Sequence, residues 1–388
     1  MIYAFIPIPV EALNTRERIR ITSNEEFTPA NGVIGGSGTQ EDPYVIEGWA
    51  VAGGDLPAIW LENTDAYVVI RNCVVGVSHD AGLKLEKVFN VVIENLSVNP
   101  ANYVNVYIFG SENIRMSGCN LVNTREDAVC IYESKNIIIE GCRIGDGRYY
   151  SLYMNHVENV VVDGCDVFGS LYGVYAEASS GITIRNCAIH DNLGDGVKFY
   201  SVQNSTISKC KLNANEDHGI FLDVSDRITV EGCEITNSSL GIWLNPAFDC
   251  RIVQNFFSNV HQNAQDDGER NLWEKNKWSD YKGADLNGDE YGDTPYRIIG
   301  AANSTDNKPF VGKTPQPTPT PQPSPRPTPS QTPFQTPPPT PSLTPYPSPS
   351  YPPETQGGFP TQLTIVAVAI AVAFAVAVIL HFKRGVKH

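Results

Sequence analysis

The chain has 388 residues, with 28 Lys and Arg against 43 Asp and Glu, which gives a formal net charge of −15 at pH 7. An acidic chain without a basic patch cannot neutralise a phosphate backbone, so the composition argues against nucleic acid as a partner. Two or three ordinary domains would fit this length, but the composition is uneven along the chain.

The first segments precede any repeat. Residues 1–15 begin MIYAFIPIPVEA, which has no basic start and too short an apolar run for a complete secretory signal, so we interpret them as the remnant of one. Residues 16–45 include GGSGT at 35–39, which lacks the Gly-Lys-Ser/Thr of a phosphate-binding loop. We expect these residues to form an N-terminal cap.

Cysteines reveal an internal repeat over residues 46–258. They recur every 22 or 23 residues, and Leu96 fills the midpoint of one double gap, in the series Cys73, Cys119, Cys142, Cys165, Cys187, Cys210 and Cys233. Extending the spacing outward reaches Trp49 and Phe256. A slot that accepts Cys, Leu, Trp or Phe is an apolar core slot.

Each repeat holds two short strands of alternating apolar residues, such as Val106 and Ile108 in the first and Ile114 and Met116 in the second. The turn between them carries an asparagine, as a left-handed residue requires, at Asn90, Asn113, Asn136, Asn159 and Asn204. Such strands, rich in Val and Ile, predict an all-β fold: a right-handed parallel β-helix of about nine coils of about 23 residues each.

Four segments follow the repeats. Residues 259–312 are expected to form a C-terminal cap, and the Pro/Thr-rich residues 313–360 an extended, disordered stalk. Residues 361–382 include about 20 consecutive residues without a formal charge, enough for one transmembrane helix. The basic residues 383–388 mark its cytoplasmic end, so the bulk of the chain is expected outside the cell.

Several repeat units resemble the parallel β-helix repeats of the NosD-like, carbohydrate-binding and sugar hydrolase (CASH) group, among them GITIRNCAI, VVVDGCDVFGSLYGVYA and ITVEGCEITNSSLGIWL. The flanks GVIGGSGTQEDPYVIEGWAV and KWSDYKGADLNGDEYGDTPYRI are similar to those of its archaeal cell-surface members. The resemblance implies the fold and a surface location, which Asn-x-Ser/Thr triplets at Asn204, Asn237 and Asn303 fit. The group mixes sugar-processing enzymes with binding modules, so no single activity is implied.

The stacked cysteines allow three interpretations. No Cys-x-x-Cys pair occurs, which argues against a metal cluster. Neighbouring coils bring the Cα atoms within disulfide reach, but in-register side chains point the same way, so we favour free, buried thiols that act as small hydrophobes. Cys250 replaces an inward residue of the second strand, whereas Cys130 falls on an outward position, where we expect an exposed thiol.

One outward position of the first strand is aromatic in most repeats. Its aromatic residues are Trp60, Tyr107, Tyr153, Tyr175, Phe221 and Trp243, and Lys84, Cys130 and Lys198 complete the column. A row of ring faces, with Asp127 beside it, suits a sugar chain, which predicts a polysaccharide or a cell-envelope glycoprotein as the partner. The alternative is that aromatic residues favour β-strands and cover one another.

The densest group of chemistry-bearing residues is Asp195 and Lys198 on one coil with Asp217 and His218 on the next. Two carboxylates on adjacent coils suit the hydrolysis of a glycosidic bond, whereas a lyase or an epimerase would use a base such as His218, Lys198 or Tyr150 and a cation to neutralise a uronate. Asp before Gly at a corner is also ordinary turn chemistry. A membrane-anchored binding or adhesion module is therefore the first hypothesis for the function, and a polysaccharide lyase, hydrolase or epimerase is the alternative.

The segment DLNGDEYGD spaces oxygen ligands as calcium loops do. Side chains at positions 1, 3, 5 and 9, with a carbonyl at 7, are supplied by Asp285, Asn287, Asp289, Asp293 and Tyr291. Position 6 is Glu290 rather than Gly, so the segment is closer to the loops of thrombospondin-type and dockerin-like repeats. We expect a structural Ca²⁺ that pins the cap, against the alternative of a solvated acidic turn. Copper delivery, a role in the NosD family, would need a Met/His/Cys cluster that the sequence lacks.

Overall fold

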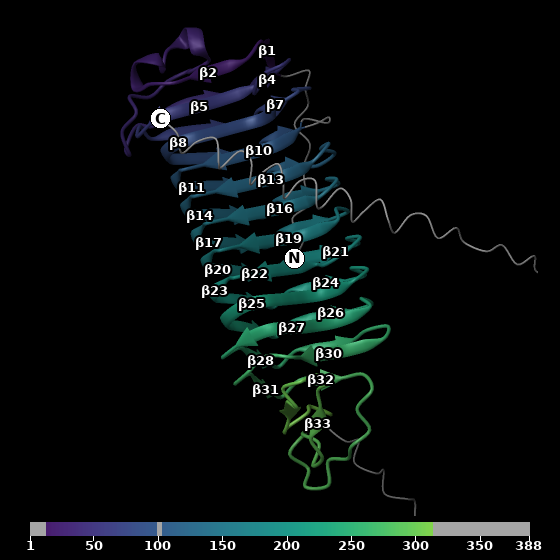
Figure 1. Ribbon diagram of the computed structural model, residues 1–388. Coiled ribbons are helices and arrows are strands. Elements are labelled where there is room, and N and C mark those ends of the chain that lie inside the picture. Colours follow the sequence, from purple (N-terminus) through teal and green to yellow (C-terminus); the bar gives the residue numbers. More distant parts are fainter. Residues whose placement is uncertain (1–12, 99–102, 313–388) are drawn as a thin grey trace, which may run out of the picture. The chain divides into compact units, whose positions relative to one another are not determined.

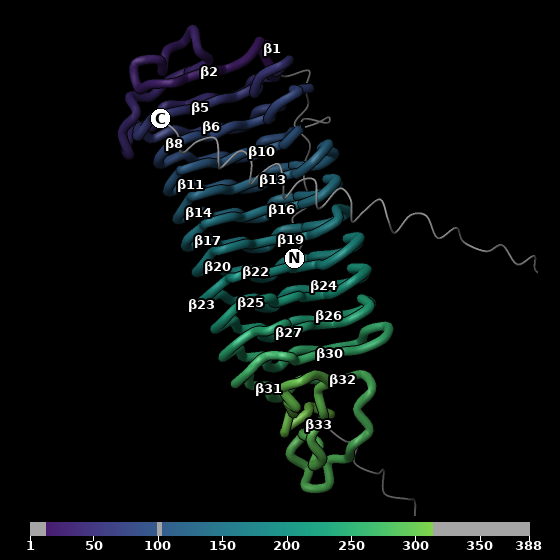
Figure 2. Tube along the Cα trace, viewed as in Figure 1, coloured from purple at the N-terminus to yellow at the C-terminus, as the bar shows by residue number. Residues whose placement is uncertain are grey.

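The computed structural model describes residues 13–98 and 103–312, and it stacks short parallel strands coil upon coil in chain order (Figures 1 and 2). Val106 pairs with Val129, and Val129 pairs with Leu152, so the strands of successive repeats are neighbours in register. The prediction of an all-β parallel β-helix is confirmed, and the stack has about ten turns. The predicted stalk and membrane segment lie outside the described residues.

Each coil contributes one strand to each of three faces. The first face holds β2 (Ile19–Ile21), β5 (Ile59–Thr64), the first part of β8 (Ala81–Glu94), β10 (Val104–Phe109), β13 (Asp127–Tyr132), β16 (Tyr150–Asn155), β19 (Tyr172–Glu177), β22 (Val197–Tyr200), the first part of β25 (His218–Glu231), β27 (Leu240–Phe248) and β30 (Gln262–Asp266).

The second face follows across the asparagine turn. It holds β3 (Tyr44–Glu47), β6 (Val68–Arg71), the rest of β8, β11 (Glu112–Ser117), β14 (Lys135–Glu140), β17 (Glu158–Asp163), β20 (Ser180–Arg185), β23 (Gln203–Ser208), the rest of β25, β28 (Arg251–Val253) and β31 (Leu272–Glu274).

The third face is a sheet of twelve short strands. These are β1 (Asn14–Arg16), β4 (Trp49–Val51), β7 (Val74–Val75), β9 (Ser97–Val98), β12 (Asn120–Leu121), β15 (Arg143–Gly145), β18 (Asp166–Phe168), β21 (Ala188–His190), β24 (Lys211–Asn213), β26 (Glu234–Thr236), β29 (Phe256–Ser258) and β32 (Lys277–Trp278). The stack extends past both ends of the nine predicted coils. The additional coils were not predicted because their strands lack the cysteine that marks the repeat.

Segments without repeat character stand near the two ends of the stack. Two 3₁₀ turns, η2 (Asn24–Glu26) and η3 (Pro29–Asn31), follow β2, and an antiparallel pair of strands, β33 (Tyr296–Arg297) and β34 (Thr305–Asp306), follows β32. None of the helices in the described part of the chain is long and apolar enough to cross a membrane.

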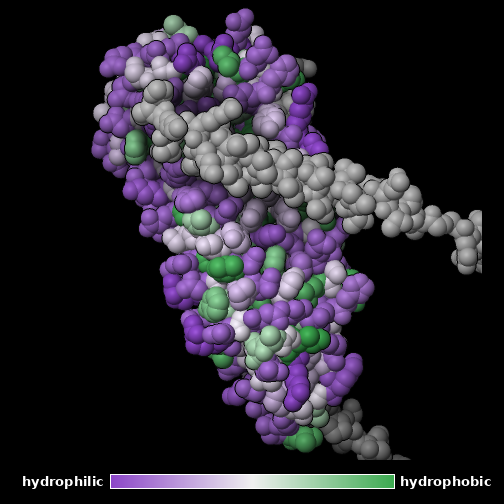
Figure 3. Space-filling model, in the orientation of Figure 1, coloured by the Kyte–Doolittle hydropathy of each residue, from purple (hydrophilic) through white to green (hydrophobic). Residues whose placement is uncertain are grey.

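Inward side chains of the three faces form one continuous apolar core. Val106, Ile108 and Ile114 are at most 1% exposed, and the surface in Figure 3 is mainly hydrophilic with scattered hydrophobic residues. The five turn asparagines all have positive φ, between 50° and 60°, as predicted. Four of them also join their side-chain amides in a hydrogen-bonded ladder, Asn90, Asn113, Asn136 and Asn159.

The cysteine stack is confirmed as buried and free of disulfides. Each of its thiols donates to a backbone carbonyl, as Cys142 does to the carbonyl of Glu140 at 3.4 Å. Cys250 stands opposite Ile228 and is 1% exposed, as expected for an inward residue. The prediction that Phe256 continues the stack is wrong: Glu234 pairs with Phe256, so the coil is one residue shorter and Asn255 stands opposite Cys233.

An amide ladder replaces the thiols beyond Cys233. The backbone N–H of Cys233 donates to Asn255 Oδ1 at 2.9 Å, and the backbone N–H of Asn255 donates to Asn276 Oδ1 at 3.0 Å. The backbone N–H of Asn276 in turn donates to Asp306 Oδ2 at 2.9 Å. The buried Asp306 therefore takes the place of a further coil, and it satisfies donors that would otherwise be orphaned in the core.

Candidate functional site

The first face brings the predicted aromatic column into register. Tyr107 pairs with Cys130, Cys130 with Tyr153 and Tyr153 with Tyr175, and the column continues through Lys198. Side chains alternate along a strand, so the positions two residues after this column also point outward, whereas those two residues before it, such as Ala128 and Ser151, are buried. The outward residues on that side stand three positions before the column, as Tyr150 and Tyr172 do. The face thus carries three parallel columns, and the aromatic ligand residues predicted from the sequence all belong to one of them.

Six tyrosines on this face form a continuous set of ring contacts, and we name them the tyrosine patch: Tyr107, Tyr132, Tyr150, Tyr153, Tyr172 and Tyr175. Tyr150 is at its centre, with ring centroids 4.9 Å from Tyr153 and 5.6 Å from Tyr172. Tyr132 was missed in the sequence because it belongs to the adjacent column, although its outward position two residues after Cys130 was a usable signal.

Cys130 lies beneath the tyrosine patch, and the prediction of an exposed thiol is wrong. Its side chain does occupy the outward column, yet the residue is only 2% exposed. The thiol donates to Asp127 Oδ2 at 3.3 Å, and burial raises its pKa strongly. Small outward residues between large ones are covered by their neighbours, which a single-strand pattern does not show.

Burial also controls the ionisation of the tyrosines. It raises the pKa of Tyr150 to about 12, and it raises the pKa of Tyr107, Tyr153 and Tyr175 as well. These phenols are therefore protonated at neutral pH and can donate hydrogen bonds. Asp127, whose pKa is raised by burial, accepts the backbone N–H of Tyr150 at 3.1 Å, so its role at this edge is at least partly structural.

Two of the four predicted catalytic residues are in direct contact. His218 Nδ1 lies 2.5 Å from Asp195 Oδ1, with the side chains 20% and 4% exposed. The carboxylate of Asp217 is on an exposed corner and has no hydrogen bond or ion pair among the described residues. The two carboxylates therefore do not act as an equivalent pair, because one is buried against a histidine and the other faces solvent.

Lys198 joins this pair to the tyrosine patch. Its Nζ lies over the rings of Tyr172, Tyr175 and Phe221, at 5.1, 5.6 and 5.2 Å from their centroids. It has no carboxylate within 4.0 Å in the described part of the chain. We name Asp195, Lys198 and His218 the acid–base cluster.

The other predicted ligand residues flank these groups. Phe221 and Trp243 stack at 5.0 Å and lie against His218, and Trp243 Nε1 donates to Asp267 Oδ2 at 2.9 Å. Trp60 lies on the same face at the other end, where Lys84 Nζ is 4.8 Å from its ring and 5.8 Å from that of Tyr107. All six predicted aromatic residues therefore lie on one face.

In the predicted calcium loop, two aspartate carboxylates accept hydrogen bonds from backbone N–H groups of the same loop. Asp285 Oδ1 accepts the N–H of Gly288 at 2.7 Å, and Asp293 Oδ2 accepts that of Leu286 at 2.6 Å. Glu290, in the position where EF-hands have glycine, has a φ of 76°. In residues 13–98 and 103–312, no group of three or more His, Cys, Asp or Glu side chains is arranged to hold a metal ion. Calcium binding stays a prediction.

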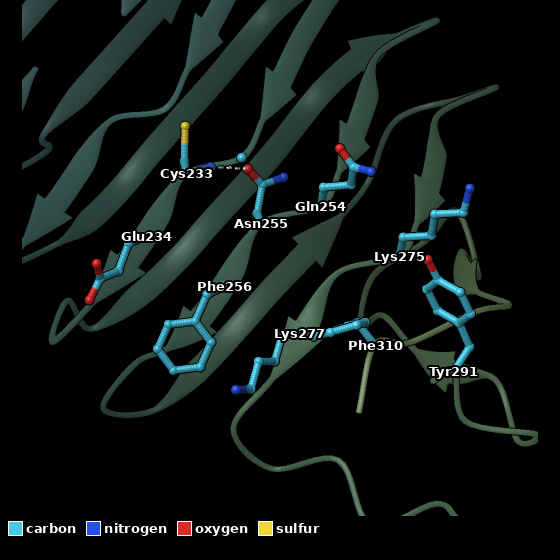
Figure 4. Close-up of a pocket in the computed structure, with 10 residues that line it drawn as sticks. Cys233, Glu234, Gln254, Asn255, Phe256, Lys275, Lys277, Tyr291 and Phe310 are labelled. Carbon is cyan, nitrogen blue, oxygen red and sulfur yellow. Dashed lines mark hydrogen bonds between the residues drawn. The ribbon is translucent and has the colours of Figure 1, made fainter. Parts of the chain in front are cut away.

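A separate hollow of about 420 Å³ lies near the C-terminal end of the stack, away from the first face (Figure 4). Strand residues Phe256 and Lys277 line it together with Lys275, and Tyr291 and Phe310 reach it from the segment that follows β32. Lys275 forms an ion pair with Glu274 at 3.7 Å. The ammonium of Lys277 lies over the ring of Phe256, 5.4 Å from its centroid. It shares no residue with the tyrosine patch.

A family model described as "Periplasmic copper-binding protein (NosD)" matches residues 94–292, slightly more than half of the chain. The chain belongs to the NosD family. No curated protein matches this NosD-family chain.

Solved structures similar to this NosD-family chain include the A-module of the mannuronan C-5 epimerase AlgE6 of Azotobacter vinelandii, with 14% identity, a TM-score of 0.46, and coverage of 62% of this chain and 89% of that one. Another is PfbA, a surface adhesin of Streptococcus pneumoniae, with 9% identity, a TM-score of 0.45, and coverage of 66% and 84%. At these values neither structure guides the assignment of a function.

Proposed function

We propose that this NosD-family chain binds a polysaccharide along its first face, with the tyrosine patch as the contact surface. The observation that carries the proposal is the unbroken set of ring contacts from Tyr107 to Tyr175. Rings on successive coils are spaced by the strand separation of about 4.8 Å, so they offer an extended apolar strip rather than a single pocket. A chain-like ligand suits such a strip better than a small molecule does.

Polar groups on the strip match a hydroxylated ligand. The protonated phenols supply donors, and Glu177, which accepts from Tyr153 Oη at 3.1 Å, supplies an acceptor. Lys84 and Lys198 place an ammonium at each end of the patch. Since Lys84 is paired with Glu86 at 3.1 Å, Lys198 is the cation more available to a ligand.

The setting that we propose is the outer surface of a cell membrane, with residues 361–382 as the anchor. The charge-free run at 363–382 and its basic flank support this location, as does the word periplasmic in the family description. Copper, which that description also names, does not fit the donor set of the described residues. Their stacked thiols are buried and bonded to backbone carbonyls, and none of the described residues form a group of three or more His, Cys, Asp or Glu that could hold a metal ion.

The test is a binding measurement on the full chain with a panel of neutral and acidic polysaccharides. Substituting both Tyr153→Ala and Tyr175→Ala removes the centre of the patch, and we expect affinity for the bound polymer to fall at least tenfold. Phe89→Ala is the matched control, because Phe89 is an exposed aromatic residue on the second face. Unchanged affinity in the double variant, or no binding to any polymer, would overturn the proposal.

A further inference from the structure

His218 is held in one orientation by the buried carboxylate of Asp195. Its Nδ1 lies 2.5 Å from Asp195 Oδ1, and the carboxylate side chain is only 4% exposed. A carboxylate can only accept, so a neutral imidazole in this position donates from Nδ1 and carries its lone pair on Nε2. Nε2 has no hydrogen-bond partner among the described residues, and the side chain is 20% exposed. This is the arrangement of a base ready to accept a proton.

Two aromatic rings fix the imidazole further. Phe221 stacks on it at 5.1 Å with an interplanar angle of 28°, and Trp243 lies 5.5 Å away. Trp243 is itself anchored to Asp267, so its ring cannot swing freely. Rigid neighbours of this kind keep a catalytic group in its productive geometry.

Lys198 supplies a cation beside this base. It is paired across the ladder with Phe221, the ring that stacks on His218. Its ammonium lies over three rings, and the nearby carboxylate of Asp223 attracts it without forming an ion pair within 4.0 Å. An ammonium in a half-buried, aromatic setting without an ion-pair partner is suited to a carboxylate carried by the ligand.

The same geometry disfavours the hydrolysis of a glycosidic bond by two carboxylates. That reaction needs both carboxyl groups to face the bond from opposite sides. Asp195 is 3% exposed and bound to His218, so its oxygens cannot reach a sugar on the surface. The cluster offers one base and one cation instead.

We propose that His218 removes the proton next to the carboxylate of a uronate unit in the bound polysaccharide, while Lys198 faces that carboxylate. This inference rests on the proposed function. The C–H bond breaks, its proton passes to His218 Nε2, and its electron pair moves into the carboxylate as an enolate beside the ammonium of Lys198.

Two fates of the enolate conserve atoms and electrons. In the first, the electron pair re-forms a C–H bond with a proton that has exchanged with solvent on His218. In the second, the pair forms a C=C bond and the glycosidic C–O bond at the neighbouring carbon breaks, and the departing oxygen takes a proton from water. Both fates begin with the same step, so exchange with solvent measures it directly.

The experiment incubates the full chain in D₂O with polygalacturonate, alginate and hyaluronan, with neutral dextran as a control polymer. Mass spectrometry follows deuterium in the uronate units, and ultraviolet absorbance follows unsaturated chain ends. We expect one or both signals with a polymer that the chain binds, and a loss of roughly 100-fold or more in His218→Gln. His190→Gln is the matched control, because His190 pairs with Asp166 on the third face.

Folding and binding readouts separate the outcomes. Polymer affinity of His218→Gln within threefold of the parent shows that the variant is folded, and Asp195→Asn provides a second variant of the same pair. A bound polymer that neither exchanges nor is cleaved, or a His218→Gln rate equal to that of the parent, overturns this inference and leaves the binding proposal standing. Failure to bind any polymer overturns both.

Discussion

Among the histidines that pair with carboxylates on neighbouring coils, His218 and His190 differ in which ring nitrogens they leave without a partner. His218 on the first face bonds Asp195 through Nδ1 alone. His190 on the third face uses both nitrogens, with Nε2 2.9 Å from Asp166 and Nδ1 2.7 Å from Asp191. The same residue types therefore build a base where one nitrogen is free and an ion-pair cluster where neither is.

The surroundings reinforce this contrast. The hydrogen bond to Asp166 raises the pKa of His190 to about 9, so this imidazole is a cation at neutral pH and has no lone pair to offer. Arg143 adds a second cation 3.5 Å from Asp166, and its guanidinium lies over Phe168. His218 instead faces aromatic rings that lead into the tyrosine patch. The His190–Asp166 pair is therefore suited to a structural role, and the His218–Asp195 pair to a role in proton transfer.

The largest effect on stability is expected at the buried acid of the pair on the first face. Asp195→Ala leaves the Nδ1–H of His218 without its acceptor in a largely buried site, and we expect the free energy of unfolding to fall by about 2–3 kcal/mol. Asp191→Ala, at a side chain that is 67% exposed, is expected to change it by about 0.5 kcal/mol or less. Chemical denaturation measures both, and equal losses would contradict the contrast.

Much of the fold could be predicted from the sequence, because equivalent positions of successive repeats are expected to stack on one another. The cysteine spacing and the turn asparagines fixed which residues stack, and the structure confirms both. The coil at Phe256 was misplaced by one residue. Asn255 stands at the position of the cysteine, so no cysteine marked that this coil is one residue shorter.

The site was predictable only in part. Column membership gave the aromatic residues of the first face, since outward positions repeat with the coil. Contacts between columns could not be read in the same way. The covering of Cys130, the ring contacts of Tyr132 and the burial of Asp195 all depend on how side chains of different columns lean on one another.

A pH effect on stability is expected from His190. Its pKa in the folded chain lies above the unfolded value of about 6.5, so folding is favoured where the imidazole is charged. The contribution is complete below about pH 6.5 and is lost as pH rises through about 9. Allowing for partial solvent screening, we expect it to be about 1–2 kcal/mol.

His190→Gln is the control for this titration. Free energies of unfolding measured at pH 6 and above pH 9 are expected to converge between parent and variant at the higher pH. A parent–variant difference that is the same at both pH values would show that the ion pairs of His190 do not stabilise the fold.

Cys130 tests whether the tyrosine patch is closed. Because the thiol is buried and its pKa is raised, we expect it to react with a maleimide much more slowly than an exposed cysteine does. Tyr153→Ala removes a neighbouring ring from the same column and is expected to speed the labelling at least tenfold, whereas Phe89→Ala is not. Mass spectrometry identifies the labelled residue, and rapid labelling in the parent would contradict a closed patch.

The smallest effect is expected from calcium at the loop 285–293. If the loop binds Ca²⁺ as its oxygen spacing predicts, adding the ion after chelation raises the melting temperature by a few degrees, and Asp285→Ala abolishes the shift. Polysaccharide affinity is expected to stay unchanged in both cases, because the loop shares no residue with the first face. A melting temperature indifferent to Ca²⁺ would favour the solvated acidic turn.

The most direct measurement is a crystal structure of the chain with a bound acidic oligosaccharide. We predict sugar rings over Tyr153 and Tyr175 on the first face, with a carboxylate near Lys198 and a carbon-bound hydrogen facing His218 Nε2. A ligand on the second or third face, or in the hollow lined by Lys275 and Lys277, with the tyrosine patch left bare, would contradict polysaccharide binding at the tyrosine patch.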